Sequence, residues 1–148
     1  MTPPADDTFS VLEFMPYQFA LLSSRLSRAL AQTCAEHGLT LSEWRLLAII
    51  ASGRSMSASD VTERSTMDAV AVHRAVMSLL RRGFIERVAV DGDKRIKQLV
   101  VTPTGHQAYE TIVPYARKLE DGLMSCLTAT EALSLRRVMR RLVEGRPK

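Results

Sequence analysis

The side chains best suited to chemistry in this sequence lie in one stretch, MDAVAVHRAVMSLLRRGF, residues 67–84. His73 and Arg74 can donate hydrogen bonds to the N7 and O6 atoms of guanine or to phosphate oxygens. The methyl groups of Ala69 and Val70 can contact the methyl group of thymine. Helical spacing turns three other apolar residues of the stretch toward a core: Val72, Val76 and Leu79. The outward face therefore favours a helix that enters a groove of DNA over a buried helix with an ordinary surface histidine.

A second cluster of cations lies in DGDKRIK, residues 91–97. This segment falls between two runs of alternating, β-branched residues that flank an Asp-Gly pair, a pattern that predicts a β-hairpin. Lys94, Arg95 and Lys97 would then lie on a thin ribbon that can reach a minor groove, where narrow A·T tracts attract a guanidinium group. Asp93 can brace Arg95 in position. The alternative interpretation is an ordinary charged turn.

Capping patterns mark the beginnings of the helices that must position these residues. The segments TLSE, SASD and TATE each place an acid three residues after a Ser or Thr, and TMDA is a weaker version with Asp68 in the first helical turn. Thr102 is the expected cap of a long helix that begins at Pro103, and Pro114 predicts a kink or a break within that helix. Gly38 is the expected end of the first helix. The expected helices span about residues 16–36, 40–52, 58–64, 67–82, 103–126 and 128–143, with the hairpin between the fourth and the fifth.

This order of elements predicts a mainly α protein with a small β-hairpin wing, in which a winged helix-turn-helix is joined to a helical dimerisation region. The outer helices are too long and too amphipathic for the small central domain to cover, so we expect a second copy to bury them. The expected segments are a flexible leader at 1–12, an N-terminal dimerisation helix at 13–39, a winged helix-turn-helix DNA-binding domain at 40–102 and C-terminal dimerisation helices at 103–148. The expected dimer contacts are Phe19, Leu119, Leu123, Leu135, Val138 and Leu142.

Charge and composition limit the class of protein. The chain of 148 residues has a formal net charge of +4, and between Arg54 and Lys97 nine Lys and Arg stand against six Asp and Glu. This placement is typical of a nucleic-acid-binding surface, and a merely solvated face gives the same count. The sequence shows neither a signal peptide nor an apolar run of the roughly 20 residues that a membrane helix needs. Two cysteines do not make a disulfide framework, so the expected location is a reducing cytoplasm.

The sequence shows no recognisable catalytic or metal centre. His37, His73 and His106 have no second ligand at metal-binding spacing, and no Gly-rich phosphate loop is present. We therefore expect neither an enzyme nor a cofactor. A protein-interaction module that does not bind DNA is an alternative, and it rests on a cationic cluster in the last helix: Arg136, Arg137, Arg140 and Arg141.

The segments LTLSEWRLLAII, SASDVTERSTMDAVAVHRAVMSLLRRGFIER, DKR and LVVTPTG together resemble the MarR (multiple antibiotic resistance regulator) family of winged-helix transcription factors, over about residues 15–142. The resemblance implies a homodimer on a pseudo-palindromic operator, usually a repressor of nearby genes that a small molecule releases. It places the recognition helix at 68–82 and the minor-groove arginine of the wing at Arg95. Ala69 and His73 stand where the family often has Lys, Ser or Thr, so the operator sequence does not carry over.

The resemblance also points to a site for an effector, because the family usually binds its ligand where the first helix and the dimer helices meet the winged domain. The residues that the sequence offers there are Tyr17, Gln18, Phe19, Arg25, Arg28, Trp44 and Arg45. An aromatic wall with a guanidinium suits a planar carboxylate. The segment PYQFALLSSRLSRAL resembles members that sense aromatic acids or their coenzyme A thioesters, with Gln18 where some of them have arginine. The structural alternative places Trp44 in the core and makes Arg45 the partner of an acid in the winged domain.

Oxidation of a cysteine is the competing trigger. Cys34, near the end of the first helix, and Cys126, near the end of the fifth, lack an obvious cationic neighbour that would lower the pKa of a thiol. We therefore expect both cysteines to be buried and inert.

Overall fold

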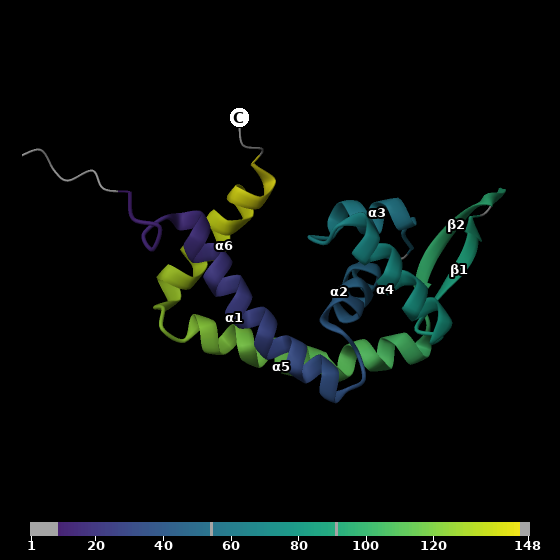
Figure 1. The fold of residues 1–148 in the computed structure, drawn as a ribbon, viewed down its shortest axis with the longest axis horizontal. Coiled ribbons are helices and arrows are strands. Elements are labelled where there is room, and N and C mark those ends of the chain that lie inside the picture. Colours follow the sequence, from purple (N-terminus) through teal and green to yellow (C-terminus); the bar gives the residue numbers. More distant parts are fainter. Residues whose placement is uncertain (1–8, 54, 91, 146–148) are drawn as a thin grey trace, which may run out of the picture. The chain divides into compact units, whose positions relative to one another are not determined.

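The computed structural model describes residues 9–53, 55–90 and 92–145. Within these ranges the chain forms six helices and one two-stranded hairpin (Figure 1), so the predicted fold class, mainly α with a β-hairpin wing, is confirmed. The chain divides into two compact units, one ending at Ile112 and one beginning at Val113. Of the predicted leader, residues 1–8 lie outside the described residues. The elements are α1 (Met15–Glu36), α2 (Leu41–Ser52), α3 (Ala58–Arg64), α4 (Ala69–Arg81), β1 (Ile85–Val90), β2 (Asp93–Val101), α5 (Pro103–Met124) and α6 (Ala129–Glu144).

Reciprocal caps begin three of the helices, as the sequence predicts. Thr40, Ser57 and Thr128 each accept a hydrogen bond from the third helical residue, whose own carboxylate accepts one from the backbone N–H of the cap. The start of α4 differs from the prediction. Asp68 is the N-cap and does not lie inside the first turn, because its Oδ1 accepts a hydrogen bond from the N–H of Ala71 at 2.8 Å.

The apolar spacing of α4 buries one face of the helix and exposes the other. The buried residues are Val72, Ala75, Val76 and Leu79. The helix ends where Gly83 adopts a φ of +71°, a left-handed conformation that glycine reaches without strain. This turn lets the chain leave α4 and enter β1 after only a few residues.

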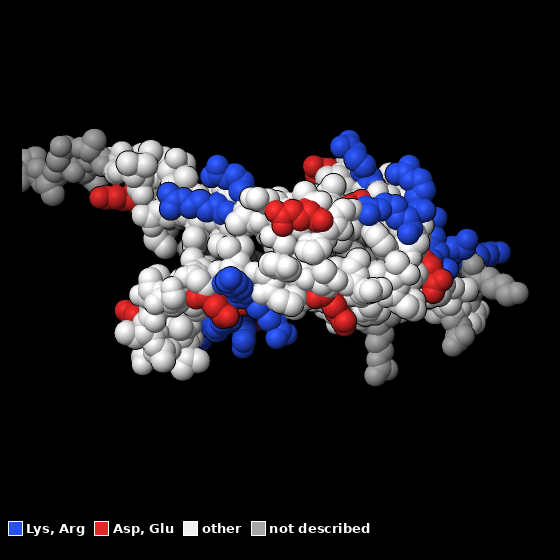
Figure 2. Space-filling model, turned by 90° about the horizontal axis from the view of Figure 1, so that it is seen from below, with Lys and Arg blue, Asp and Glu red and all other residues white. Residues whose placement is uncertain are grey.

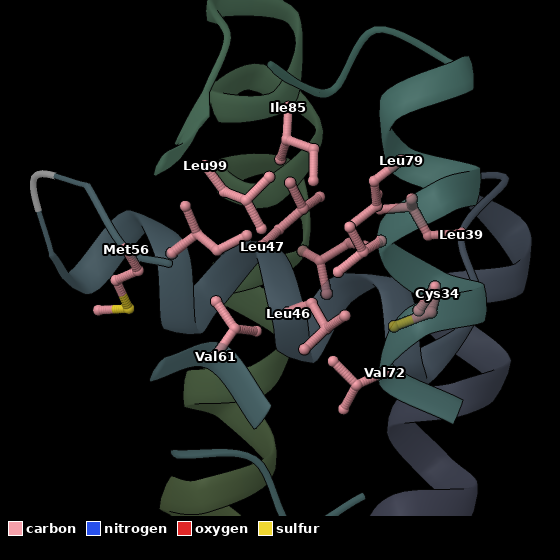
Figure 3. Packing of buried hydrophobic residues seen from close by; sticks show 14 residues of the cluster. Cys34, Leu39, Leu46, Leu47, Met56, Val61, Val72, Leu79, Ile85 and Leu99 are labelled. Carbon is pink, nitrogen blue, oxygen red and sulfur yellow. The ribbon is translucent and has the colours of Figure 1, made fainter. Parts of the chain in front are cut away.

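The core of the first unit lies where α2, α4 and the hairpin meet (Figure 3). α2 contributes Leu46 and Leu47, α4 contributes Leu79, and the two strands contribute Ile85 and Leu99, all of which are at most 2% exposed. Burial of one such aliphatic side chain contributes about 1.5–3 kcal/mol to stability. The same hydrophobic cluster therefore holds both α4 and the hairpin against α2.

The hairpin pairs β1 with β2 in antiparallel register from Ile85 opposite Val101 to Ala89 opposite Lys97, with an irregularity after Ala89. A further extended residue, Met56, pairs with β2. Its N–H donates to the carbonyl of Leu99 at 3.2 Å and its carbonyl accepts from the N–H of Leu99 at 2.7 Å. The connection between α2 and α3 is thereby tied to the base of the wing.

Thr102 and Pro103 begin α5 as predicted. The Oγ1 atom of Thr102 accepts a hydrogen bond from the N–H of Gly105 at 3.1 Å and donates one to the carbonyl of Gly83 at 2.6 Å. The helix then continues through Pro114 to Met124, so the predicted break is wrong and the kink stays a prediction. A proline removes one backbone donor, and in a helix of 22 residues the other turns keep their hydrogen bonds.

The second unit contains the end of α5 and the whole of α6. An ion pair joins the two helices, with the Nη1 atom of Arg136 at 2.8 Å from the Oε1 atom of Glu120. The exposed apolar side chains of α6 are Leu133, Leu135, Val138, Met139, Leu142 and Val143. None of the helices in the described ranges is long and apolar enough to cross a membrane.

Candidate nucleic-acid interface

The N-terminal half of α4 presents the four side chains that the sequence singles out. Ala69, Val70, His73 and Arg74 are all exposed, and Val70 keeps 68% of its surface open although it is apolar. Their outward position follows from the burial of the opposite face of the helix in the core. The exposed face therefore combines two apolar residues, Ala69 and Val70, with two hydrogen-bond donors, His73 and Arg74, and carries no acid beyond the capping Asp68.

A short turn sets α4 against α3. Four residues, Ser65–Asp68, separate the two helices, a length typical of a helix-turn-helix. The Oγ atom of Ser65 accepts a hydrogen bond from the N–H of Met67 at 2.9 Å, and Asp68 then caps α4. Because both ends of the turn are hydrogen-bonded, the beginning of α4 has a defined direction relative to α3.

The opposite end of α4 is attached to the rest of the unit by a buried carboxylate. Glu43, only 5% exposed, lies 3.1 Å through Oε2 from the Nη1 atom of Arg82 and accepts a hydrogen bond from the hydroxyl of Ser78 through Oε1 at 2.5 Å. Burial by itself raises the pKa of Glu43. The hydrogen bonds from Ser78 and Thr40 and the charge of Arg82 outweigh burial and hold that pKa below its usual range. Glu43 is therefore ionised over the neutral pH range.

The wing carries cations beside α4. Arg95 and Lys97 are exposed on β2, whereas the side chains of Lys94 and Asp93 lie outside the described residues, so the predicted brace between Asp93 and Arg95 stays a prediction. Ser55 donates a hydrogen bond to the Oε1 atom of Gln98, which attaches β2 to the connection that follows α2.

An open groove of about 490 Å³ joins the helix to the wing. Arg87 on β1 reaches across it, with Nη2 at 4.0 Å from the Sδ atom of Met77 on α4. The groove is lined by Met77, Leu80, Arg81, Ile85, Glu86 and Arg87. Helix and hairpin therefore form one continuous surface.

Positive charge gathers over this surface. Figure 2 shows Lys and Arg side chains over the part of the first unit that holds α4 and the hairpin. The exposed cations of α3, α4 and the two strands are Arg64, Arg74, Arg81, Arg87, Arg95 and Lys97. A polyanion with regularly spaced charges matches such a distribution.

The residues predicted to bind an effector lie on two helices, α1 and α2. Arg45 donates a hydrogen bond to the Oγ atom of Ser27 at 2.8 Å, and among the described residues it forms no ion pair with an acid of the winged domain. Trp44 is half-buried and stacks on Tyr109, with ring centroids 6.0 Å apart. Tyr17 lies ten residues before Ser27, about 15 Å along α1. The other predicted contacts on α1 are exposed: Tyr17, Gln18, Phe19, Arg25 and Arg28.

The two cysteines differ in their surroundings. Cys34 is fully buried, and burial raises the pKa of its thiol, with a smaller opposing effect from the charge of Arg45. Cys126 is exposed, and its Sγ atom donates to the carbonyl of Leu123 at 3.4 Å. The prediction of burial is therefore confirmed for Cys34 and wrong for Cys126, because the end of α5 lies at the surface.

The predicted dimer contacts occupy apolar positions of both units. Phe19 on α1 is exposed, and so are Leu135, Val138 and Leu142 on α6. Leu119 and Leu123 on α5 are half-buried. In the cationic cluster of α6, Arg136 pairs with Glu120, and Arg137, Arg140 and Arg141 are exposed.

The sequence interpretation missed the contact between Glu43 and Arg82. Glu43 is the third helical residue of a capping box, which by itself explains an acid at this position, and Arg82 belongs to a basic pair at the end of an amphipathic helix. The available signal was an acid whose position in α2, three residues before Leu46, lies on the same face as a core leucine. The pairing partner, 39 residues away, had no sequence signal.

Comparison with known proteins agrees with this geometry. A family model described as "MarR family" matches residues 37–96. The HTH-type transcriptional repressor IacR of Pseudomonas putida is 22% identical over 136 residues, covering 92% of this chain and 81% of the relative. The crystal structure of the MarR family transcriptional regulator SPO1453 from Silicibacter pomeroyi DSS-3 is 29% identical, with a TM-score of 0.78, and covers 92% of this chain and 97% of that chain.

A second similar structure connects DNA binding with a small molecule. It concerns the regulation of DNA binding of Bordetella bronchiseptica BpsR by 6-hydroxynicotinic acid, with a TM-score of 0.80, 19% identity and coverage of 93% of this chain and 99% of that chain. The first two relatives are named as transcriptional regulators, which agrees with the prediction that the chain is not an enzyme. The arrangement of caps, helix-turn-helix and wing agrees with the family match over residues 37–96 and with these likenesses, and the chain is similar to transcriptional regulators of the MarR family.

Proposed function

We propose that the protein is a sequence-specific DNA-binding repressor that inserts the N-terminal half of α4 into the major groove. The observation that carries the proposal is the exposed face of α4, where Ala69, Val70, His73 and Arg74 project from a helix whose other face is buried in the core. A helix-turn-helix presents the early residues of its second helix to base edges. The DNA binding of BpsR, a protein of similar structure, supports the same use of the fold.

Small residues and donors on α4 suit different parts of a base pair. Ala69 and Val70 lie in the first turn, where a short side chain lets the helix backbone approach the base edges and offers methyl groups to thymine. His73 and Arg74 lie one turn later and can donate to guanine or to phosphate. The flanking cations on α3, on the end of α4 and on β1 suit phosphates, which position the helix and carry no sequence information.

A homodimer completes this proposal. Large apolar side chains are exposed along α6 and, separately, along the N-terminal part of α1, and such exposed apolar surface is typical of an interaction site. A second copy of the same helices is the simplest cover for them, through a closed two-fold contact. Two recognition helices would then read half-sites about 34 Å apart, one turn of the duplex.

An aromatic carboxylate is the effector class that we propose. Tyr17, Arg25 and Arg28 offer exposed aromatic and guanidinium groups along α1, and 6-hydroxynicotinic acid regulates the DNA binding of the similar protein BpsR. A titration with benzoates, cinnamates and their coenzyme A thioesters tests the proposal, with release from DNA as the expected result. If none of these compounds binds, the proposed effector class is wrong. The proposal that the protein binds DNA does not depend on this result.

The redox alternative has one observation in its favour, the exposure of Cys126, and one against it, the raised pKa of Cys34. Release of DNA by peroxide from the wild type but not from a Cys34→Ser/Cys126→Ser variant would support that alternative. Equal DNA binding with and without peroxide would reject it.

Selection of bound fragments from the source genome, followed by affinity measurements on a selected and a scrambled duplex, tests the DNA-binding function. We expect a preference for the selected duplex and a steep loss of affinity with salt, about 0.9 log–log units per phosphate contact. His73→Ala should change the preference at one base position by about 1–3 kcal/mol. A protein with no affinity for duplexes at low salt would be an interaction module, and the proposal would fail.

A further inference from the structure

The structure assigns to Glu43 a role in operator recognition that its capping position does not require. We propose that Glu43, acting through Arg82, is a positioning residue that holds the C-terminal end of α4 against the corner between α1 and α2. This inference rests on the proposed DNA-binding function, since it concerns how accurately α4 meets the bases.

Glu43 is joined to α4 through both of its carboxylate oxygens. Oε1 accepts the hydrogen bond from Ser78 at 2.5 Å, and Oε2 lies 3.1 Å from Nη1 of Arg82. The same Oε2 accepts the capping hydrogen bond from the N–H of Thr40 at 2.8 Å. One buried side chain therefore binds α2 to two successive turns of α4. A charge-assisted network of this kind is stronger and more directional than neutral hydrogen bonds.

Arg82 extends the connection to two further elements. It is the C-cap of α4, and its Nη2 atom donates to the carbonyl of Gly38, just past α1, at 2.6 Å. Its guanidinium lies 4.6 Å from the centroid of the Phe84 ring, immediately before β1. The planar, forked geometry of arginine allows these contacts at once, which a lysine cannot reproduce. The corner after α1, the start of α2, the end of α4 and the beginning of the wing thus meet at one side chain.

The contact between Glu43 and α4 lies far from the residues proposed to contact bases, so a small rotation of the helix at this contact moves those residues by a larger distance. Ser78 and Arg82 lie at the C-terminal end of α4, and Ala69 to Arg74 lie at the other end of a helix of 13 residues, about 20 Å long. A tilt of about 5° at the attached end would move the far end by about 1.7 Å. Hydrogen bonds to base edges weaken steeply over such a displacement. Contacts to phosphates, made by long flexible cations, tolerate it.

Because Glu43 is buried, an effect on the position of α4 can be distinguished from a direct contact between Glu43 and DNA. At 5% exposure its carboxylate cannot touch DNA, so any effect of its substitution on base discrimination passes through the protein. Two roles remain to be distinguished: capping of α2 and positioning of α4. Glu131 provides a matched comparison, because it is the capping-box glutamate of α6 and accepts hydrogen bonds only from Thr128 among the described residues.

The experiment compares the affinities of the full-length protein for its selected duplex and for a scrambled duplex. In Glu43→Ala we expect the ratio of the two affinities to fall by about tenfold, the value of one good base contact, with little change on the scrambled duplex. Glu43→Gln should restore most of the ratio. Its amide oxygen can accept from Thr40 and Arg82 while its amide nitrogen donates to Ser78. Glu131→Ala should leave the ratio unchanged.

A double substitution tests the route through Arg82. If Glu43 acts through Arg82, then Glu43→Ala should reduce the ratio no further in a protein that already carries Arg82→Ala. Additive losses would overturn that route. Because both affinities come from one preparation, an inactive fraction cancels in the ratio.

The outcomes separate this inference from the proposed function. A wild-type protein that binds both duplexes equally removes the proposed function and this inference with it. If the wild type discriminates between the duplexes while Glu43→Ala has the same affinity ratio or loses affinity equally on both, only the positioning role of Glu43 is rejected.

Discussion

At the scale of single residues, burial has opposite consequences for two ionisable groups of the first unit. For Cys34, loss of water is the larger effect and the pKa of the thiol rises, while the charge of Arg45 only reduces the shift. For Glu43, Ser78, Thr40 and Arg82 overcome the loss of water and the pKa falls. The difference is the number of donors that each group receives, and it makes Cys34 chemically quiet and Glu43 permanently charged near neutral pH.

The two cysteines should therefore react at different rates in the folded protein. We expect iodoacetamide to modify Cys126 and to leave Cys34 unmodified, because only the thiolate reacts and Cys34 is both buried and shifted toward the thiol. Peptide mass spectrometry after a short exposure measures both sites, and denatured protein is the control in which both react. Faster modification of Cys34 than of Cys126 would contradict the burial argument.

The lowered pKa of Glu43 predicts a component of acid instability. A carboxyl whose pKa is lower in the folded protein than in the unfolded chain stabilises the fold above its ordinary pKa of 4.5. That contribution is lost as the pH falls through the lowered folded value. Urea denaturation of the wild type and of Glu43→Gln from pH 7 to pH 3 should show a free energy of unfolding that declines more steeply with acid in the wild type. Parallel declines would mean that Glu43 has the same pKa in both states.

At the scale of elements, the recognition helix and the wing depend on close contact between backbone segments. Gly105, in the first turn of α5, lies beside the segment that joins α4 to β1, and a Cβ atom there would stand 1.9 Å from the carbonyl oxygen of Phe84. The hydrogen bond from Thr102 to Gly83 reinforces the same junction. The start of α5 therefore fixes the exit of α4 as well as its own helix.

Gly105→Ala should be strongly destabilising, by about 3 kcal/mol, because the added methyl group meets backbone that cannot move aside cheaply. Gly122→Ala in the same helix is the matched control, since no described atom outside its own surroundings lies within 4 Å of the added Cβ. There we expect a gain of about 0.5–1 kcal/mol from helix propensity. Thermal or urea denaturation measures both, and equal effects of the two substitutions would contradict the contact.

Arg95 on β2 should contribute to affinity and not to the fold. Arg95→Ala should weaken binding to the selected duplex, most at an A·T-rich flank, because a narrow minor groove concentrates negative potential. The melting temperature should stay within the variation of wild-type preparations, since the residue is exposed. Unchanged affinity on all duplexes would show that the wing does not touch DNA.

At the scale of the whole molecule, the exposed apolar residues are the main feature that one copy of the chain does not explain. They include Phe14, Met15 and Phe19 on or next to α1, and Val138 and Leu142 on α6. A dimer that buries them would also double the number of phosphates contacted, which links assembly to the salt dependence of DNA binding.

Val138→Glu/Leu142→Glu should dissociate the proposed dimer, because it places charge in the centre of the apolar stripe of α6. Leu133→Glu is the control, since at about 100° per residue Leu133 lies nearly opposite that stripe and is already 71% exposed. Sedimentation velocity reports the mass, and the salt dependence of DNA affinity should become shallower only in the double variant. A wild type that is monomeric at all concentrations would refute the dimer.

The sequence by itself determined the features that depend on neighbouring residues. The bounds of α3, the three reciprocal caps, the end of α4 at Gly83 and the hairpin follow from hydrogen bonds and periodicities that span a few positions. The exposed residues of α4 were predictable in the same way. The burial of Val72, Val76 and Leu79 fixes which residues of the helix point outward.

Only the tertiary structure decided which distant residues meet. The pairing of Glu43 with Arg82, the bridge from Met56 to Leu99 and the stacking of Trp44 on Tyr109 join positions 39 to 65 residues apart. The exposure of Cys126 likewise contradicts an interpretation made from local pattern, and the continuation of α5 through Pro114 decides against the break, one of the two expectations at that residue. Turns and helix ends are stabilised by residues that are close in the sequence, so a short pattern predicts them. Contacts between distant residues depend on how whole helices and strands pack. The packing of whole elements leaves no periodic pattern in the sequence from which these contacts could be predicted.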